Sequence, residues 1–267
     1  MTPRTPVVDD PPPPSTTDGA PRVEYAPVVA CGGTEVGIEA RVVDDGVVPP
    51  AGLALLDAAS RMASWFAPGA AAPSHIAVNV TVTELFDDDV LAAVEHLVRD
   101  PRMPVDGVWV EVPEDAVAAH RVAALDRLGE LAATGALVVI DDLDMRSASL
   151  RDIGLIAPHG WKLDPALISG SGHPGLAETA ITRAFLKLAH SLGVAVIADG
   201  VVTTEQADAL ADLGCQFGQG PVWSGPLDGS VVLDWIGRNR SRALGGGEPA
   251  GGLPPGELSG PARGAPR

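Results

Sequence analysis

Positive charge is scarce in this 267-residue sequence: 18 Lys and Arg residues stand against 35 Asp and Glu residues, for a formal net charge of −17. A body this acidic repels a phosphate backbone, which argues against general nucleic-acid binding. Long apolar runs are missing too. No stretch approaches the roughly 20 apolar residues that span a bilayer, and the N-terminus lacks the apolar core of a signal peptide. We therefore expect a cytoplasmic protein with no membrane partner.

Cysteine is limited to Cys31 and Cys215. Two cysteines are too few for a disulfide framework or a zinc site, so both are expected to be buried structural thiols in a reducing compartment. The six histidines show no ligand spacing. The glycine-rich phosphate-binding motifs of nucleotide-binding open sheets are also missing, which disfavours that fold class.

The composition divides the chain into three parts. Residues 1–22 form a proline-rich arm and residues 238–267 a tail rich in glycine and proline, and both are expected to be disordered. Between them, residues 23–237 alternate Val- and Ile-rich segments with segments of helical periodicity. The expected strands cover 23–30, 36–40, 75–80, 107–112, 136–141, 160–163, 194–198 and 216–220, and the expected helices cover 51–66, 87–99, 115–133, 147–156, 176–191, 204–213 and 230–237.

Eight strands alternating with helices favour an α/β fold of the closed (β/α)₈ TIM type over an open doubly wound sheet. The first two strands, 23–30 and 36–40, are separated by only five residues. That connection is too short for a parallel crossover and predicts a hairpin. We therefore expect a barrel whose first strand is antiparallel to its neighbours.

Oxygen-bearing side chains recur where the expected strands end. One such residue alone is usually a solvated loop residue or a helix cap, but a series of them is less easily explained in that way. In a barrel the carboxyl ends of the strands converge on one face, where such folds keep their active sites. Hard cations such as Mg²⁺ or Mn²⁺ prefer carboxylate and amide oxygens. The series predicts a metal site, and its members are Glu39, Asn79, Glu111, Asp141, Asp142 and Asp164.

Eight short motifs in order give residues 23–236 a resemblance to the EAL family of cyclic di-GMP phosphodiesterases. The segments at 25–29, 37–41 and 78–81 resemble the family's YQPIV, GYEAL and VNVS. Those at 111–114, 141–142 and 161–164 resemble ExxE, the start of DDFGTGYSSL, and IKID. The last two, 197–206 and 213–220, resemble IAEGVETEEQ and LGCDxxQG.

The resemblance implies a role for each matching residue. It implies that Mg²⁺ or Mn²⁺ is bound by Glu39, Asn79, Glu111 and Asp141, with Asp142 helping to hold a second ion. Two such cations would activate water and stabilise an in-line phosphodiester displacement. The same resemblance implies that Lys162 assists the attacking water, that Asp142 and Asp199 take part in catalysis, and that Gln219 lies in the substrate site.

Other positions depart from the family pattern. Asp199 replaces a catalytic Glu and is one methylene shorter, and Val202 replaces the second Glu of that motif. The two glycines of the DFGTGYSS loop become Asp144 and Arg146, so that loop is expected to take another shape. Glu114, which anchors the loop in the family, is retained; here it either keeps that role or caps the following helix.

The expected substrate contacts are altered as well. Val43 stands where the family has a phosphate-binding Arg, and Ala26 where it has Gln. Arg41 replaces the Leu of the EAL signature; it either substitutes as a phosphate contact or is a surface cation. The segment 43–51 is also shorter than the family's, which affects an edge of the ligand groove and dimer contacts there.

Three functions stay open at this point. The leading hypothesis is an EAL-type domain whose phosphodiesterase activity is weak or lost and which acts in cyclic di-GMP signalling as a ligand-binding or regulatory module. The second is an active phosphodiesterase that forms pGpG, with Asp199 in place of Glu. The third is a protein-interaction module that no longer binds nucleotide. The partners considered are cyclic di-GMP, a regulatory protein and a second copy of the chain.

Overall fold

A computed structural model describes residues 22–32, 34–43, 51–143, 158–169 and 176–244. The arm up to residue 21, the end of the tail from 245, the expected helix at 147–156, and the positions of Asp144 and Arg146 lie outside the described residues. In the part of the chain that is described, no helix combines the length and the apolar character needed to cross a membrane.

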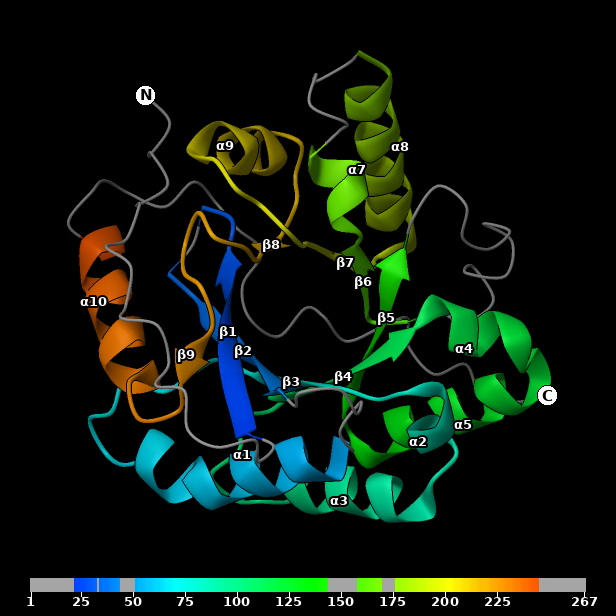
Figure 1. The fold of residues 1–267 in the computed structure, drawn as a ribbon, viewed down its shortest axis with the longest axis vertical. Coiled ribbons are helices and arrows are strands. Elements are labelled where there is room, and N and C mark those ends of the chain that lie inside the picture. Colours follow the sequence, from blue (N-terminus) through cyan, green and yellow to red (C-terminus); the bar gives the residue numbers. More distant parts are fainter. Residues whose placement is uncertain (1–21, 33, 44–50, 144–157, 170–175, 245–267) are drawn as a thin grey trace.

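Eight strands close into a barrel with helices around it (Figure 1). The order around the barrel is β2-β3-β4-β5-β6-β7-β8-β1, and β1 closes the circle by pairing with β2. Strand β1 is antiparallel to both β2 and β8, whereas the pairs from β2 to β8 are parallel. The predicted barrel with one reversed strand is therefore confirmed. The strands are β1 (Arg22–Ala30), β2 (Val36–Val43), β3 (Ile76–Asn79), β4 (Val108–Pro113), β5 (Leu137–Leu143), β6 (Gly160–Leu163), β7 (Ala195–Ala198) and β8 (Phe217–Gly218).

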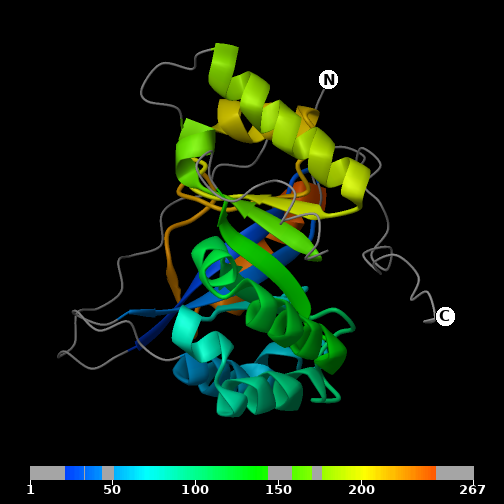
Figure 2. The ribbon, with the colours of Figure 1, turned by 90° about the vertical axis from the view of Figure 1, so that its right-hand side faces the viewer.

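Helices pack against opposite sides of the barrel (Figure 2). The longer ones are α1 (Ala51–Trp65), α3 (Asp88–Val98), α5 (Arg121–Thr134), α8 (Leu176–Leu192), α9 (Thr204–Asp212) and α10 (Val232–Leu244). Shorter elements that the sequence did not predict are α2 (Val82–Leu85), α7 (Pro165–Ser169) and the edge strand β9 (Leu227–Asp228), which pairs with β1.

Two expected helix boundaries are corrected by the structure. The helix expected over 115–133 is split into α4 (Glu114–Ala119) and α5, because the backbone of His120 (φ −127°, ψ 37°) leaves the helical region. The body was expected to end at residue 237, but α10 continues to Leu244. Its later turns still contact the body, since Asn239 is buried and Arg240 donates to the carbonyl of Ala72 at 2.7 Å.

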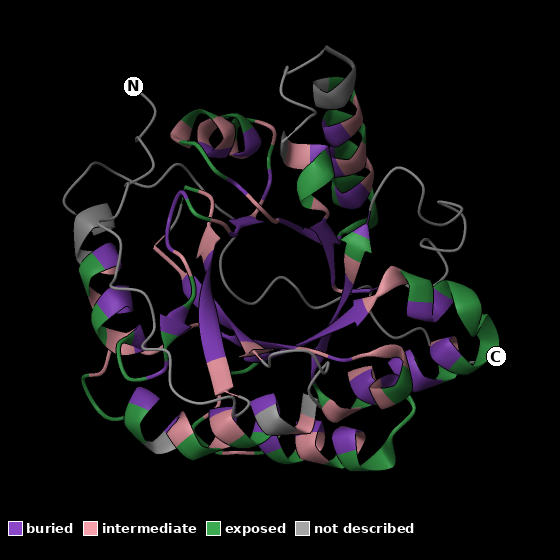
Figure 3. Ribbon diagram, viewed as in Figure 1, coloured by how far each residue is buried: buried purple, intermediate pink, exposed green. Residues whose placement is uncertain are grey.

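The barrel interior is apolar at one end and polar at the other. Side chains alternate along a strand, so Trp109 and Glu111 of β4 both point inward while Val108 and Val110 face the helices. An apolar group of strand residues that includes Trp109 fills the end of the barrel where the parallel strands begin. Most strand residues are buried (Figure 3). His75 stacks on Trp109 there, with ring centroids 3.6 Å apart. The polar end is therefore the end at which the parallel strands have their carboxyl termini.

His75 is held in its neutral form. It is fully buried, and this burial lowers the pKa of His75 to about 3. Gly37 on β2 is required beside it, because a Cβ at Gly37 would lie 2.1 Å from the imidazole ring. A small residue on β2 and a flat ring on the neighbouring chain segment therefore close this end of the barrel together.

Candidate active site

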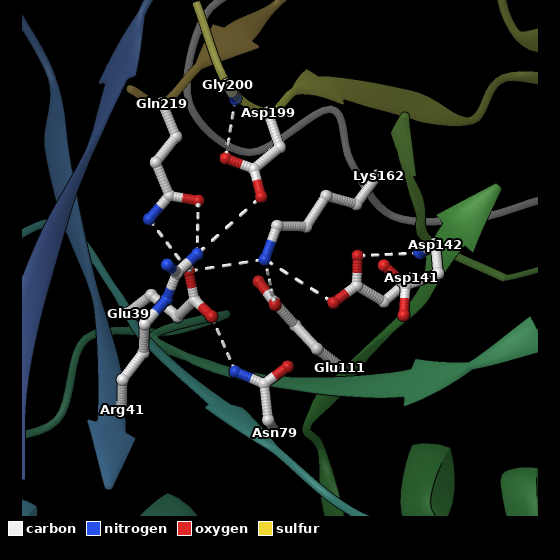
Figure 4. Close-up of polar contacts among 10 residues, drawn as sticks. All are labelled: Glu39, Arg41, Asn79, Glu111, Asp141, Asp142, Lys162, Asp199, Gly200 and Gln219. Atoms are coloured by element: carbon white, nitrogen blue, oxygen red, sulfur yellow. Dashed lines mark hydrogen bonds and ion pairs between the residues drawn. The ribbon is translucent and has the colours of Figure 1, made fainter. Parts of the chain in front are cut away.

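The predicted site residues converge at the carboxyl ends of the parallel strands (Figure 4). Each comes from a different strand or from the residue that follows it, so the barrel itself brings together positions far apart in sequence. The residues that meet are Glu39 (β2), Asn79 (β3), Glu111 (β4), Asp141 (β5), Lys162 (β6), Asp199 after β7 and Gln219 after β8.

Lys162 is the centre of this group. Its side chain is fully buried, and its Nζ lies 2.6 Å from Glu111 Oε2, 3.2 Å from Glu39 Oε2 and 3.5 Å from Asp141 Oδ2. Burial opposes the charge on Lys162, but the surrounding carboxylates outweigh burial and hold the pKa of Lys162 well above its usual range. Lys162 is therefore a permanent ammonium that neutralises part of the acidic group.

Glu39 is the most heavily hydrogen-bonded carboxylate of the site. Its Oε1 accepts from Asn79 Nδ2 at 2.5 Å, and its Oε2 accepts from Arg41 Nη2 at 2.8 Å and Gln219 Nε2 at 2.7 Å. Burial by itself would raise the pKa of Glu39, yet the cations of Lys162 and Arg41 bring that pKa below its usual range. Glu39 is consequently ionised.

Glu111 has the opposite environment. Burial and the nearby charge of Glu39 raise the pKa of Glu111 well above its usual range, although Lys162 opposes the rise. Glu111 is the most buried of the three carboxylates near Lys162, so burial weighs most on its pKa. Among the described residues, none donates a hydrogen bond to Glu111 Oε1.

Arg41 extends toward the carboxylates of the site. Its Nη2 contacts Glu39, lies 3.4 Å from Gln219 Oε1 and forms an ion pair of 3.6 Å with Asp199 Oδ2. The side chain is 39% exposed, so it lies at the mouth of the group. Burial opposes its charge, but Glu39 raises the pKa of Arg41 further above its normal range. Arg41 therefore faces the carboxylates of the site while its side chain stays partly exposed.

Asp199 and Asp142 lie at the edge of the group. The carboxylate of Asp199 accepts from the backbone N–H of Gly200 at 2.7 Å as well as pairing with Arg41. Asp142 is exposed and takes a left-handed backbone (φ 58°), which a non-glycine residue adopts at some energetic cost. The pairing of β5 with β6 shifts register between Ile140 and Leu143, and such an irregularity re-aims neighbouring side chains.

Two further predicted residues lie outside this convergence. Glu114 occupies the first turn of α4, half-buried, and the loop that it would anchor extends into residues outside the described part. Asp164 Oδ1 accepts from the backbone N–H of Ala166 at 2.6 Å, beside the start of α7, so Asp164 has the structural role of a helix cap.

The fit to a divalent cation is good in chemistry and incomplete in geometry. Three carboxylates and an amide are the donor set that Mg²⁺ or Mn²⁺ prefers, and the unpartnered Glu111 Oε1 is an oxygen that a cation would satisfy. In the described residues, however, no three or more His, Cys, Asp or Glu side chains are arranged to hold a metal ion. The ammonium of Lys162 and the guanidinium of Arg41 stand among these carboxylates.

The sequence indicated on which face of β2 Arg41 lies, but not which residue it contacts. Arg41 follows Glu39 by two residues, so both had to share one face of β2. That spacing predicts the face but not the partner. Asn79, Lys162 and Gln219 also reach Glu39 only in the folded barrel.

Comparison with known proteins agrees with this architecture. The family model of the EAL domain matches residues 18–226, well over half of the chain, and the chain belongs to this family. Rv1357c of Mycobacterium tuberculosis is 30% identical over 184 residues, which is 67% of this chain and 60% of that protein. Cyclic di-GMP phosphodiesterase PdeR of Escherichia coli is 24% identical over 201 residues, 75% of this chain and 30% of PdeR. Across the relatives, the match spans between 27% and 60% of their length.

Solved structures show the same fold. The EAL domain of Mycobacterium smegmatis DcpA superposes with a TM-score of 0.72 at 25% identity, covering 83% of this chain and 99% of that one. Klebsiella pneumoniae BlrP1, solved as a complex with manganese and cyclic di-GMP, gives a TM-score of 0.65 at 21% identity, covering 80% of this chain and 58% of BlrP1.

Proposed function

We propose that this EAL domain binds cyclic di-GMP but hydrolyses it weakly or not at all, and that it acts as a ligand-binding or regulatory module. One observation carries the proposal. The carboxylate at the position of the family's catalytic Glu belongs to the shorter Asp199, and it is already engaged by the Gly200 N–H and by Arg41. A carboxylate drawn back by about 1 Å can lower a rate on the order of 100-fold through misplacement alone.

The remaining groups support binding. A divalent cation would be held by Glu39, Asn79, Glu111 and Asp141, with Asp142 adjacent. When bound, the metal supplies Lewis-acid activation of water and neutralises phosphate charge. Of the chain's own groups, Lys162 would orient the water through its ammonium.

A different pair of side chains would contact a phosphate of the ligand. Arg41 and Gln219 lie at the mouth, where Arg41 offers N–H donors to a phosphate oxygen. The net charge of −17 makes the entry of this dianionic ligand dependent on such local cations.

A second candidate, an active phosphodiesterase, is favoured by the retained inner group. Glu39, Asn79, Glu111, Asp141 and Lys162 come together from five adjacent strands, which is the set that the family resemblance assigns to metal and water. In this alternative Asp199 takes the place of the usual Glu. The alternative is also supported by a relative that is named a cyclic di-GMP phosphodiesterase.

Titration and product analysis separate these functions. Isothermal titration with cyclic di-GMP, run with Mn²⁺ and with EDTA, measures binding, and chromatography of the same mixtures measures pGpG. We expect binding in Mn²⁺ and a rate at least about 100-fold below that of an intact EAL phosphodiesterase assayed in parallel. Turnover at the rate of the intact enzyme would favour the second candidate. No binding at all would favour the protein-interaction module instead.

The location and the partner of the domain are also part of this proposal. We expect the domain to work in the cytoplasm, with a regulatory protein or a second copy of the chain as its partner. Size-exclusion chromatography with light scattering, with and without cyclic di-GMP, tests for the second copy. A mass of one chain under both conditions would leave the regulatory protein as the partner to seek.

A further inference from the structure

The guanidinium of Arg41 lies beside Glu39, at a position where the family signature has a leucine. Arg41 lies two residues after Glu39 on the same face of β2, and its guanidinium lies next to that carboxylate (Figure 4). The residue opposite Glu39 on β1 is Ala26, which presents only a methyl group on this face. The local sequence therefore combines a long cation on one strand with a small neighbour on the next.

Arg41 is one of three nitrogen groups gathered at Oε2 of Glu39. A carboxylate offers about four lone-pair positions to donors. Asn79 Nδ2 takes one at 2.5 Å, Gln219 Nε2 another at 2.7 Å, and Lys162 Nζ approaches at 3.2 Å. Arg41 Nη2, at 2.8 Å, is the third nitrogen group at Oε2, beside Gln219 and Lys162, whereas among the described residues Oε1 accepts from Asn79. A metal ion that coordinates Oε2 must therefore displace one of these three groups.

Arg41 is the donor that must leave. Asn79, Lys162 and Gln219 match the family's motifs, so they are compatible with a metal-binding form of the site, whereas Arg41 departs from those motifs. A guanidinium and a divalent cation that share one carboxylate also repel each other. The other side of the site differs, because among the described residues none donates to Glu111 Oε1.

We infer that Arg41 is a built-in competitor of the divalent cation at Glu39 and that it weakens metal binding at this site. The ligand class concerned is a hard divalent cation such as Mg²⁺ or Mn²⁺. This inference deepens the proposed function and rests on it, since it takes the carboxylate group to be the domain's metal site. It explains why the carboxylates retain the chemistry for a metal while two side-chain cations stand among them.

The test uses Mn²⁺ alone, without nucleotide, on the full-length chain. Mn²⁺ binding is measured by isothermal titration and by the electron paramagnetic resonance signal of free Mn²⁺ for the wild type, Arg41→Leu and Arg41→Ala. We expect both variants to bind Mn²⁺ at least about tenfold more tightly, because a hydrogen bond to a charged group is strong enough to shift an equilibrium by that factor. Circular dichroism checks that both variants are folded.

Arg22→Leu is the matched control. It removes the same charge from the neighbouring strand β1, where Arg22 pairs with Glu24 at 2.8 Å. We expect this variant to bind Mn²⁺ as the wild type does. The inference is overturned if neither Arg41 variant binds Mn²⁺ more tightly than the wild type, or if Arg22→Leu tightens binding equally. Because no cyclic di-GMP is present, failure here leaves the nucleotide-binding result of the earlier experiment to stand or fall separately.

Discussion

At the scale of single residues, the proposed loss of turnover rests on Asp199 and on neighbours that also depart from the family pattern. Asp199→Glu restores the missing methylene, and we expect it to raise the rate of pGpG release only modestly. Val202 is 57% exposed at the position of the motif's second Glu, and Val43 on β2 cannot contact a phosphate through hydrogen bonds. Initial rates in Mn²⁺ measure the effect, with Asp199→Asn as the inactive control. Recovery of the full rate of an intact relative by this one change would contradict the proposed loss of activity.

His75 gives a second prediction at this scale, on stability against pH. Its pKa is about 3 when folded and about 6.5 when unfolded, so the unfolded chain binds the extra proton first as pH falls. Stability is therefore complete above pH 6.5 and decreases from there toward pH 3. Between pH 7.5 and pH 5 we expect His75 to account for a loss of about 2 kcal/mol in the free energy of unfolding.

Urea unfolding at a series of pH values measures this dependence. His75→Phe, which keeps an aromatic ring against Trp109, should flatten the decrease below pH 6.5. The control is His96→Ala, because His96 is an exposed residue near the end of α3 and should leave the pH dependence as it is. An unchanged slope in His75→Phe would assign the acid sensitivity to other groups.

At the scale of elements, α10 shows where the body of the domain ends. A chain that stops after residue 237 loses the buried Asn239, which donates to the Trp235 carbonyl, and the bond from Arg240 to the Ala72 carbonyl. We expect this truncation to lower the free energy of unfolding by about 1–3 kcal/mol, measured by urea unfolding. A chain that stops after Leu244 keeps both contacts and should be as stable as the full chain. Equal stability of the two truncated chains would return the boundary to residue 237.

The sequence predicted the long elements and failed on the short and polar ones. Six of the eight barrel strands contain the Val or Ile residues that strands buried on both faces need, and the other two are β6 and β8. Helix α2 has four residues, too few for periodicity to show, although Thr81 and Glu84 form a capping box at its start. Helix α10 was cut short because the chain from residue 238 on is rich in glycine and proline, which predicts a tail, whereas the helix continues to Leu244.

The candidate site, too, was predictable in part. Strand-end positions could be predicted because the barrel geometry fixes which residues meet, and Glu39, Asn79, Glu111 and Asp141 do meet. The orientation of a long flexible side chain could not be predicted, because it is set by the electrostatics of the folded site. Arg41 is oriented toward Glu39 and Asp199 for that reason, and the pattern of residues along a strand does not predict this orientation.

At the scale of the whole molecule, the net charge of −17 makes the response to cations a general property as well as a local one. Any salt screens repulsion among the surface carboxylates and so stabilises an acidic fold. A bound divalent cation adds a second, saturable contribution by mass action. The two contributions must be separated before metal binding is inferred from thermal stability.

We therefore expect Mg²⁺ and Mn²⁺ at millimolar concentration to raise the Tm by more than NaCl of equal ionic strength. The excess should be small in the wild type, because Arg41 and Lys162 already compensate the site's carboxylates. Differential scanning fluorimetry measures the excess, and Glu111→Gln should remove it, since that change deletes a ligand charge while preserving shape. Glu95→Gln on α3 removes the same charge away from the site and serves as the control. If NaCl raises the Tm as much as Mn²⁺ does in the wild type, the effect is screening, and the carboxylate group binds no metal under these conditions.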